Sequence, residues 1–405
     1  MKKSILRITL LLALPLMVLS SCIKDELPNT DADILDIELD KDVIIGKKIE
    51  NDRITVFITP NSYGDLTNIK PTYVLSEGSK IIRGDDNYDY SSAHEIEVIS
   101  EDGNWRKVHE VRIMDMAFPT EYYFENWEEN RNTSGVYEDC YERLMNNGNT
   151  SDFYIWASGN LGYRITGKGT NPSDYPTYKT LSQDDAHNGA YAAVLETRYV
   201  GAIGQGSPLA AGNLFIGEFS GKGINIMKQQ MKATRFGIPF NKKPKSLKVW
   251  FKYKSGGIIS IYNESGDIIG TRTTNNDNSG NNQNTGSKDY AAIYAVMFDN
   301  VKAKELYNGK NYLDGSTILS SPAEVGRAIL TDNTKYGTPT NKEGYPNEYV
   351  EIELPFTFSS PIDENRLKNF EYSITIVFSS SYYGAEFQGA VGSKLWIDDV
   401  ILECE

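Results

Sequence analysis

The sequence predicts an all-β protein in which an N-terminal Ig-like sandwich is followed by a larger jelly-roll β-sandwich. Short runs of alternating apolar and polar residues recur along the chain, which is the pattern of strands with one buried face. Clusters of Gly, Asn, Asp and Pro separate these runs, and no long amphipathic helix pattern is found. The 405 residues include 26 Tyr, 34 Gly and only 3 His, which is more typical of an extracellular β protein than of a cytosolic enzyme.

Composition and charge exclude two classes of protein. With 40% hydrophobic and 24% charged residues, the chain has the balance of a globular protein, which excludes bulk disorder. The formal net charge is −14, whereas a nucleic-acid-binding protein needs a basic surface. Nucleic acid is therefore not an expected partner.

The N-terminus has the pattern of an export signal. Lys2, Lys3 and Arg7 precede an apolar run over residues 8–19, which is shorter than the ~20 residues that a spanning helix needs. Leu19-Ser20-Ser21-Cys22 resembles a bacterial lipobox, which implies a signal peptide over residues 1–21 and a lipid on Cys22. The alternative is ordinary signal cleavage with Cys22 incidental. Residues 22–33 are polar and predict a tether.

A short acidic stretch follows the predicted lipidation site. Lys24-Asp25-Glu26 resembles the surface-export tag of Bacteroidetes lipoproteins. The resemblance implies a protein on the outer face of an outer membrane, held there only by its lipid anchor. No other segment is long and apolar enough to span a bilayer.

Residues 34–117 predict the Ig-like domain. Strand patterns occur at 34–39, 54–59, 96–99 and 108–113, and Asp102-Gly103 between the last two is a strong hairpin signal. Closely spaced strands without a helical period favour an Ig-like sandwich of about 90 residues. We find no chemistry in this segment, so we interpret it as a spacer.

Residues 118–405 predict the jelly roll. Leu247, Val249, Phe251 and Tyr253 share one face of a strand, and the residues at 248, 250, 252 and 254 share the other. Residues 349–354 and 372–378 alternate in the same way. Short helices are expected near 305–306 and over 322–330. The first and last strands of this domain are expected to meet edge to edge.

Several stretches of the second domain resemble the putative carbohydrate metabolism domain family of Bacteroidetes lipoproteins. The stretches are Ala233-Thr234-Arg235-Phe236-Gly237-Ile238-Pro239-Phe240, Ala291-Ala292-Ile293-Tyr294-Ala295-Val296, Leu313-Asp314-Gly315, and Phe387-Gln388-Gly389-Ala390-Val391-Gly392-Ser393 leading into residues 395–400. The resemblance implies a carbohydrate-related function for most of residues 120–405.

The ends of this domain also resemble carbohydrate-binding jelly rolls, in which a structural calcium ion often joins the first and last strands. The matching stretches are residues 124–127, 187–194 and 396–400. The resemblance implies Ca²⁺ held by Glu125 and Asp398, with carbonyl oxygens near 187–191 completing an oxygen shell. The alternative is that Glu125 is a solvated charge and Asp398-Asp399 is a bulge or turn.

Sugar-binding sites combine flat aromatic faces with a few orienting polar groups. Trp250 is a candidate because its strand places it on the lysine side rather than the apolar side; the alternative is that a loop, such as one from residues 120–180, covers it. Tyr154 and Trp156 share a face, with ordinary core packing as the alternative. Tyr382 and Tyr383 form an aromatic pair in a loop, where binding residues are often found.

Catalysis is the alternative to binding. Glycoside hydrolysis usually needs two carboxylates at a set separation, and Glu351 and Glu353 on one strand face would lie roughly 7 Å apart. Any solvated strand face has the same appearance. An adhesin or structural lipoprotein is the third possibility. Cys140 and Cys404 either pair or stay free thiols, and no His, Cys and Asp cluster has transition-metal spacing.

The sequence therefore predicts an outer-membrane surface lipoprotein whose jelly roll binds a glycan, in polysaccharide capture or use. The expected partners are a glycan or polysaccharide, the membrane through the lipid anchor alone, and other surface proteins for glycan uptake.

Overall fold

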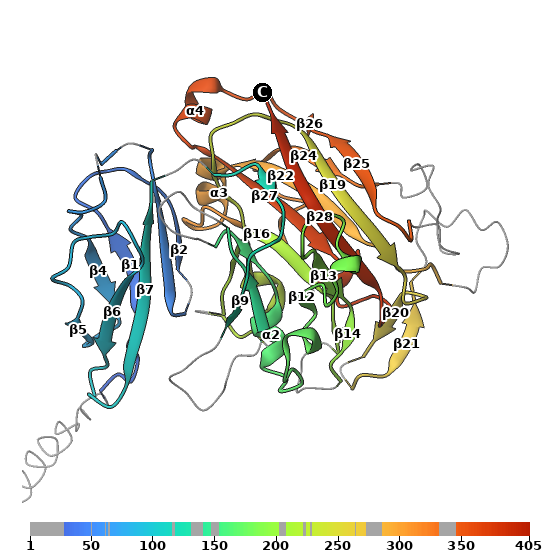
Figure 1. Ribbon diagram of the computed structural model, residues 1–405, viewed down its shortest axis with the longest axis horizontal. Helices are drawn as coiled ribbons and strands as arrows, with labels where there is room; N and C mark the ends of the chain where they lie inside the picture. The colour runs from blue at the N-terminus through green and yellow to red at the C-terminus, as the bar shows by residue number, and fades with distance from the viewer. Residues whose placement is uncertain are drawn as a thin grey trace, which may run out of the picture.

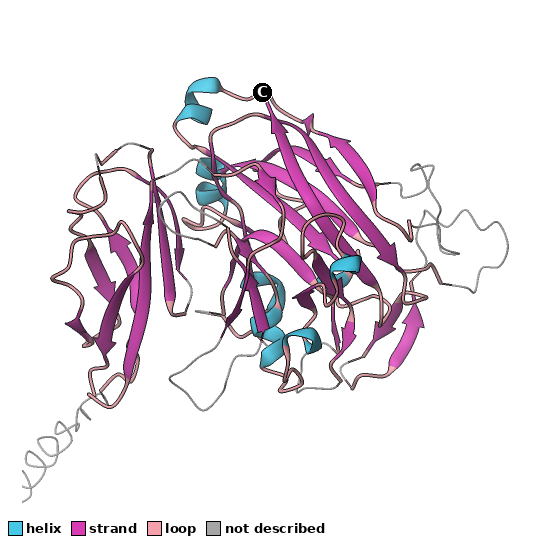
Figure 2. Cartoon of the chain, viewed as in Figure 1, coloured by secondary structure: helices cyan, strands magenta, loops and turns pink. Residues whose placement is uncertain are grey.

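The computed structural model describes residues 28–405, apart from 50, 61, 64, 116–117, 131–140, 147–153, 202–207, 222–223, 227–228, 264, 273–285 and 332–345. The predicted signal peptide, Cys22 and Cys140 lie outside the described residues. Figure 1 shows two β-sandwiches side by side, the smaller one N-terminal, and Figure 2 shows how short the helices are. The predicted all-β fold is confirmed.

The N-terminal sandwich packs a two-stranded sheet against a five-stranded sheet. Its strands, in spatial order, are β1 (Ile34–Glu38) and β4 (Thr72–Leu75) in the first sheet, and β2 (Ile44–Ile49), β3 (Arg53–Ile58), β7 (Arg106–Met114), β6 (His94–Ile99) and β5 (Lys80–Arg83) in the second. β3 and β7 pair in parallel, while β6 and β7 form the hairpin predicted at Asp102-Gly103. Gly103 has φ +71°, which a tight hairpin turn often requires of a glycine.

The larger sheet of the C-terminal sandwich has nine strands in the described residues. In spatial order they are β23 (Leu313–Asp314), β17 (Thr234–Phe236), β16 (Asn213–Phe219), β27 (Tyr372–Ser379), β22 (Ala292–Asp299), β24 (Glu324–Ile329) and β26 (Thr357–Phe358), with β11 (Trp156–Ala157) on β16 and β18 (Ile238–Phe240) on β27. Residues 372–378 of β27 are buried on both faces, so this strand is covered from both sides.

The smaller sheet has six strands in the described residues: β12 (Thr177–Lys179), β13 (Ala193–Glu196), β28 (Lys394–Cys404), β19 (Pro244–Lys254) and β25 (Val350–Pro355), with β8 (Glu121–Tyr122) on β28. The alternation predicted for β19 is confirmed, because Leu247, Val249, Phe251 and Tyr253 are buried in the core between the sheets. Tyr122 of the first strand pairs with Val400 of the last, as the sequence analysis expected.

A sharp bend at Gly237 divides β17 from β18, so that the two halves of this segment pair with different strands. β17 pairs with β16, and β18 pairs with β27. Gly237 has φ +105°, and a Cβ there would lie 2.5 Å from the Phe298 ring, so only glycine fits.

One of the two predicted short helices is present. α3 (Asn300–Leu306) begins after Asp299, whose side chain accepts a hydrogen bond from Lys302 N as an N-cap. The helix expected over 322–330 is wrong. Strand β24 is found there because residues 324–329 pair with the central strand β22.

The remaining elements are short. They are the hairpins β9 (Trp127–Asn130) with β10 (Tyr141–Leu144), β14 (Arg198–Tyr199) with β15 (Leu209–Ala210) and β20 (Ser260–Tyr262) with β21 (Ile268–Thr271), the helices α2 (Asn160–Arg164) and α4 (Glu364–Lys368), and the 3₁₀ turns η1 (Pro172–Asp174), η2 (Gln183–Asp185), η3 (Gln230–Ala233) and η5 (Gly384–Glu386). Among the residues described, no helix combines the length and the apolar character that crossing a membrane requires.

The two sandwiches share a core. Phe57 of β3 packs against Phe118 with ring centroids 4.6 Å apart, and both belong to the hydrophobic cluster that fills the C-terminal sandwich. Lys48, only 6% exposed, donates a hydrogen bond to the Trp156 carbonyl oxygen at 3.2 Å. Arg53 pairs with Glu128 of β9 at 2.9 Å. The N-terminal sandwich is thus docked firmly on its neighbour.

Candidate functional site

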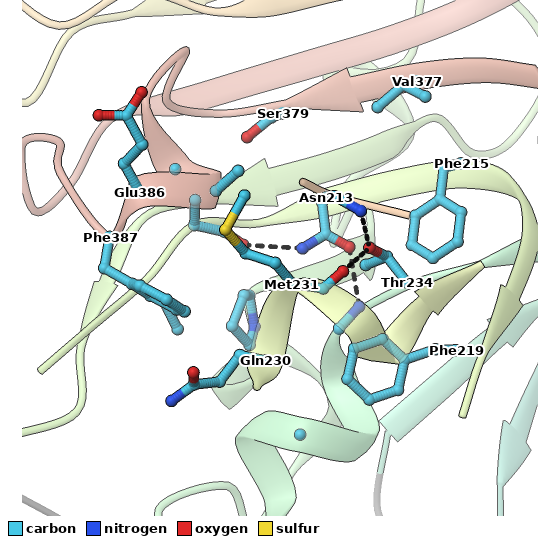
Figure 3. Close-up of a pocket in the computed structure, with 18 of the residues that line it drawn as sticks. Asn213, Phe215, Phe219, Gln230, Met231, Thr234, Val377, Ser379, Glu386 and Phe387 are labelled. Carbon is cyan, nitrogen blue, oxygen red and sulfur yellow. Dashed lines mark hydrogen bonds between the residues drawn. The ribbon is translucent and has the colours of Figure 1, made fainter. Parts of the chain in front are cut away.

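A cavity of about 630 Å³ lies against the outer face of the nine-stranded sheet. Its floor is formed by Phe215 of β16, Phe236 of β17, Tyr294 of β22 and Val377 of β27. Helix α2, turn η3 and the loop after β27 form its walls. In Figure 3, Glu386 and Phe387 lie on one side of the cavity, and Phe215 and Phe219 lie on the other.

An aromatic cluster forms the wall after β27. Tyr382 stacks on Tyr290 with ring centroids 4.8 Å apart, and Tyr383 lies edge-on to Tyr382 at 5.0 Å. The Arg272 guanidinium lies 3.5 Å from the centre of the Tyr383 ring and pairs with Glu386 at 2.6 Å. Tyr382, Tyr383 and the neighbouring Phe387 are all half-buried, so part of each ring stays open.

Polar side chains also line the cavity. Asn213 accepts a hydrogen bond from Gly159 N at 2.8 Å and donates one to Ala211 O at 3.2 Å. Thr234 donates to Met231 O at 2.8 Å and accepts from Gly315 N at 3.0 Å. These contacts fix the amide and hydroxyl groups in the cavity wall, as Figure 3 shows.

A buried carboxylate supports the aromatic wall from behind. Asp289 is fully buried and accepts hydrogen bonds from the Ser381 and Ser393 hydroxyls and from Ala390 N at 2.8 Å. Burial raises the pKa of Asp289 to about 6, although these donors oppose the shift. Because Ser381 precedes Tyr382 and Ala390 lies beyond Phe387, this carboxylate holds both ends of the loop.

The stretches that resembled the family meet at this cavity. Each of four stretches contributes wall residues: Thr234 and Phe236, Ala292 and Tyr294, Gly315, and Phe387. The sequence analysis quoted these stretches for the resemblance but did not name their residues as binding residues. Asn213 and Phe219 were missed as well. Their shared position in the sheet could have been found only by knowing that β16, β17, β22, β23 and β27 are neighbours.

Of the predicted binding residues, Tyr382 and Tyr383 line the cavity and Trp250 lies elsewhere. Trp250 is half-buried on the outer face of the six-stranded sheet. In the strand register it lies opposite Glu351 of β25 and Asp398 of β28. The His187 ring stacks on it with centroids 3.8 Å apart. The described loop that covers Trp250 therefore contains His187, which lies outside the suggested residues 120–180.

Tyr154 and Trp156 are each only 3% exposed. Trp156 packs among Tyr122, Phe124 and Phe378 in the core, and the Tyr154 hydroxyl donates to Glu128. Both residues also border the second cavity described below, but at this exposure each offers little ring surface, so the alternative of core packing describes them better than a stacking platform does.

Glu125 and Asp398 converge on the same loop, as the calcium hypothesis required. Asp398 accepts hydrogen bonds from His187 N at 3.0 Å and Asn188 N at 3.2 Å, and Glu125 accepts one from Ala190 N at 2.9 Å. The loop thus offers N–H donors to both carboxylates, whereas a calcium shell would need its carbonyl oxygens. Burial raises the pKa of Asp398 to about 6. The contacts do not favour a metal here, and bound calcium stays a prediction.

The carboxylates considered for hydrolysis lie far from the cavity in the fold. Glu351 and Glu353 are exposed on β25, at the edge of the other sheet, where Glu353 accepts a hydrogen bond from the Ser246 hydroxyl at 2.9 Å. Glu386 is the one carboxylate among the described residues that line the cavity. Cys404 is half-buried and bonds no other cysteine among the described residues; Cys140, with which it either pairs or stays unpaired, lies outside them.

Comparison with known proteins relates the whole described architecture to solved structures. A structure of a putative glycoside hydrolase from Bacteroides thetaiotaomicron matches with 31% identity and a TM-score of 0.75, over 94% of this chain and 99% of that one. A putative glycoside hydrolase from Bacteroides vulgatus matches with 30% identity and a TM-score of 0.53, over 71% of this chain and 99% of that one. No curated protein matches the sequence.

The family model described as putative carbohydrate metabolism domain matches residues 123–403, which make up most of the C-terminal sandwich and include every wall of the cavity. The protein therefore belongs to the putative carbohydrate metabolism domain family.

Proposed function

We propose that the C-terminal sandwich binds a glycan, without cleaving it, in the cavity beside Tyr382 and Tyr383. The observation that carries the proposal is the wall chemistry: half-buried aromatic rings and fixed amide and hydroxyl groups line one cavity of about 630 Å³. Aromatic faces suit the apolar faces of sugar rings, and a few placed polar groups orient the hydroxyls. The volume is that of a typical small-ligand site.

The carboxylate count favours binding over hydrolysis. Retaining and inverting glycosidases usually place two carboxylates around the scissile bond. The described cavity walls supply Glu386 alone, and Arg272 already pairs with it. Hydrolysis remains the second candidate because the two relatives are described as putative glycoside hydrolases.

Titration of the full mature chain with neutral polysaccharides tests the proposal, with affinity electrophoresis as the measurement. Tyr383→Ala should weaken binding about tenfold, which is a loss of about 1.4 kcal/mol. Tyr88→Ala removes an exposed tyrosine from the N-terminal sandwich and should leave binding unchanged. Equal binding by all three proteins would refute the site. Release of reducing sugar that disappears in Glu386→Gln would favour the hydrolase.

We further propose that the protein is a lipoprotein on the outer face of an outer membrane, where it takes part in polysaccharide capture. The lipobox-like residues before Cys22 and the acidic stretch after it support this location. Labelled palmitate should be incorporated into the wild type and not into Cys22→Ser. External protease should digest the protein on intact cells; protection from protease would contradict surface exposure.

A further inference from the structure

A second cavity lies where the two sandwiches meet. It has a volume of about 480 Å³, and the N-terminal sandwich contributes Asn51 and Asp52 from the β2–β3 turn. The C-terminal sandwich contributes Arg143 of β10 and Arg164 of α2. We call this space the interdomain cleft.

The cavity and the interdomain cleft share part of their walls. Ile165, Thr177, Phe219 and Ile226 border both. The two spaces therefore adjoin at these four residues, which we call the neck.

The neck exposes apolar surface. Ile165 follows helix α2 and is 53% exposed, although it is a large aliphatic side chain. Phe219 is half-buried, and Gly162 of α2 leaves room for its ring, since a Cβ at Gly162 would lie 3.1 Å from Phe219 Cζ. An apolar ridge between two partly polar cavities matches the alternating apolar and hydroxyl-bearing surfaces of a sugar chain.

Charges in the interdomain cleft are balanced. Asp33 pairs with Lys107 at 2.5 Å and Glu142 pairs with Lys179 at 3.0 Å. Asp52 lies 4.0 Å from Arg143. The described lining carries three acidic side chains, Asp33, Asp52 and Glu142, and two basic ones, Arg143 and Arg164. Neither sign dominates, which favours a neutral ligand rich in hydroxyl groups over a polyanion.

We propose that one neutral glycan chain of several sugars runs from the cavity across the neck into the interdomain cleft, so that the N-terminal sandwich contributes to binding. This inference rests on the proposed function and extends it. Continuity with the cavity argues for this occupant, because a chain held at Tyr383 lies in a space that adjoins the cleft at the neck. The N-terminal sandwich then forms part of the binding site and is more than the spacer that the sequence analysis expected.

Oligosaccharide ladders test the extension. Xylo-, manno-, gluco- and β-1,4-galacto-oligosaccharides of two to eight sugars are titrated into the full mature chain by calorimetry, with oligogalacturonate as the acidic comparison. For the neutral series that binds, affinity should rise about tenfold between the shortest and longest members. Acidic oligosaccharides should bind more weakly at every length.

Two variants separate the extension from the cavity itself. Gly221→Phe fills the cleft, because a Cβ at Gly221 meets only Ile226 Cδ1, at 3.5 Å. This variant should abolish the rise in affinity with oligosaccharide length and leave the affinity for the shortest sugar unchanged. Gly270→Phe is the matched control, because a Cβ at Gly270 meets nothing within 4 Å. It should change neither the affinity for the shortest sugar nor the rise in affinity with length. Asn51→Ala should reduce binding of the long members only.

The outcomes distinguish the two proposals. If affinity does not depend on length, or Gly221→Phe keeps the gain, the extension is wrong while a loss in Tyr383→Ala still supports the cavity. Tightest binding to oligogalacturonate would overturn the neutral substrate class. If no ladder binds the wild type, the proposed function and its extension fail together.

Discussion

Asp289 should make the stability of this protein depend on pH in the direction opposite to most carboxylates. Its pKa is raised to about 6 by burial, against an ordinary value of 3.8. As pH falls, the folded chain takes up this proton before the unfolded chain does. The native state therefore binds more protons between about pH 4 and pH 6, and the contribution of Asp289 to stability rises as pH falls through that window.

The size of the effect follows from the shift. Each pKa unit corresponds to 1.36 kcal/mol, so about two units give roughly 3 kcal/mol over the whole window. One unit below the folded pKa, near pH 5, about half of this should be present. Asp289→Asn has almost the same shape and does not titrate, so it isolates this one group.

Urea unfolding of wild type and Asp289→Asn at pH 7 and pH 5 measures the effect. The free energy of unfolding of wild type minus that of the variant should increase by about 1.4 kcal/mol on going to pH 5. Burial also raises the pKa of Asp398. Because Asp398 is present in both proteins, its effect on stability cancels in the difference. An unchanged difference would mean that the pKa of Asp289 is not raised, because its hydrogen bonds or water offset the cost of burial.

Three further predictions concern the fold. Gly237→Ala should destabilise the protein by about 2 kcal/mol or more, because the new Cβ meets the Phe298 ring at a positive φ, while Gly270→Ala at an open position should cost less than about 0.5 kcal/mol. Lys48→Met should cost about 1–3 kcal/mol, as it leaves a buried carbonyl without this donor, and melting should still show one transition; two separate transitions would contradict the shared core. If calcium joins Glu125 and Asp398, chelator should lower the melting temperature and metal analysis should find calcium; an unchanged melting temperature with no calcium would mean that the backbone N–H groups alone satisfy Asp398.

Local periodicity was enough to predict the strands. The alternation at Leu247–Tyr253 predicted both the strand and its buried face, because a period of two leaves one face for the core. It failed at residues 322–330, where Val325, Ala328 and Leu330 do not alternate with a period of two, although residues 324–329 pair with a central strand. Tertiary pairing decided that element, and pairing partners are not visible in one segment.

The binding site was predicted only in part for the same reason. Tyr382 and Tyr383 could be named because aromatic residues in a loop are informative without a fold. Trp250 was placed on the correct face of its strand, but His187, distant in sequence, covers it. Asn213, Thr234 and Phe387 come from three separate segments that only the sheet order brings together.

The packing of Phe57 on Phe118 has a mechanical consequence. Because the two sandwiches share this core, force applied to a glycan held beside Tyr383 would be carried through packed side chains to strand β3. Stretching a single molecule between its ends should therefore give one rupture event in place of two.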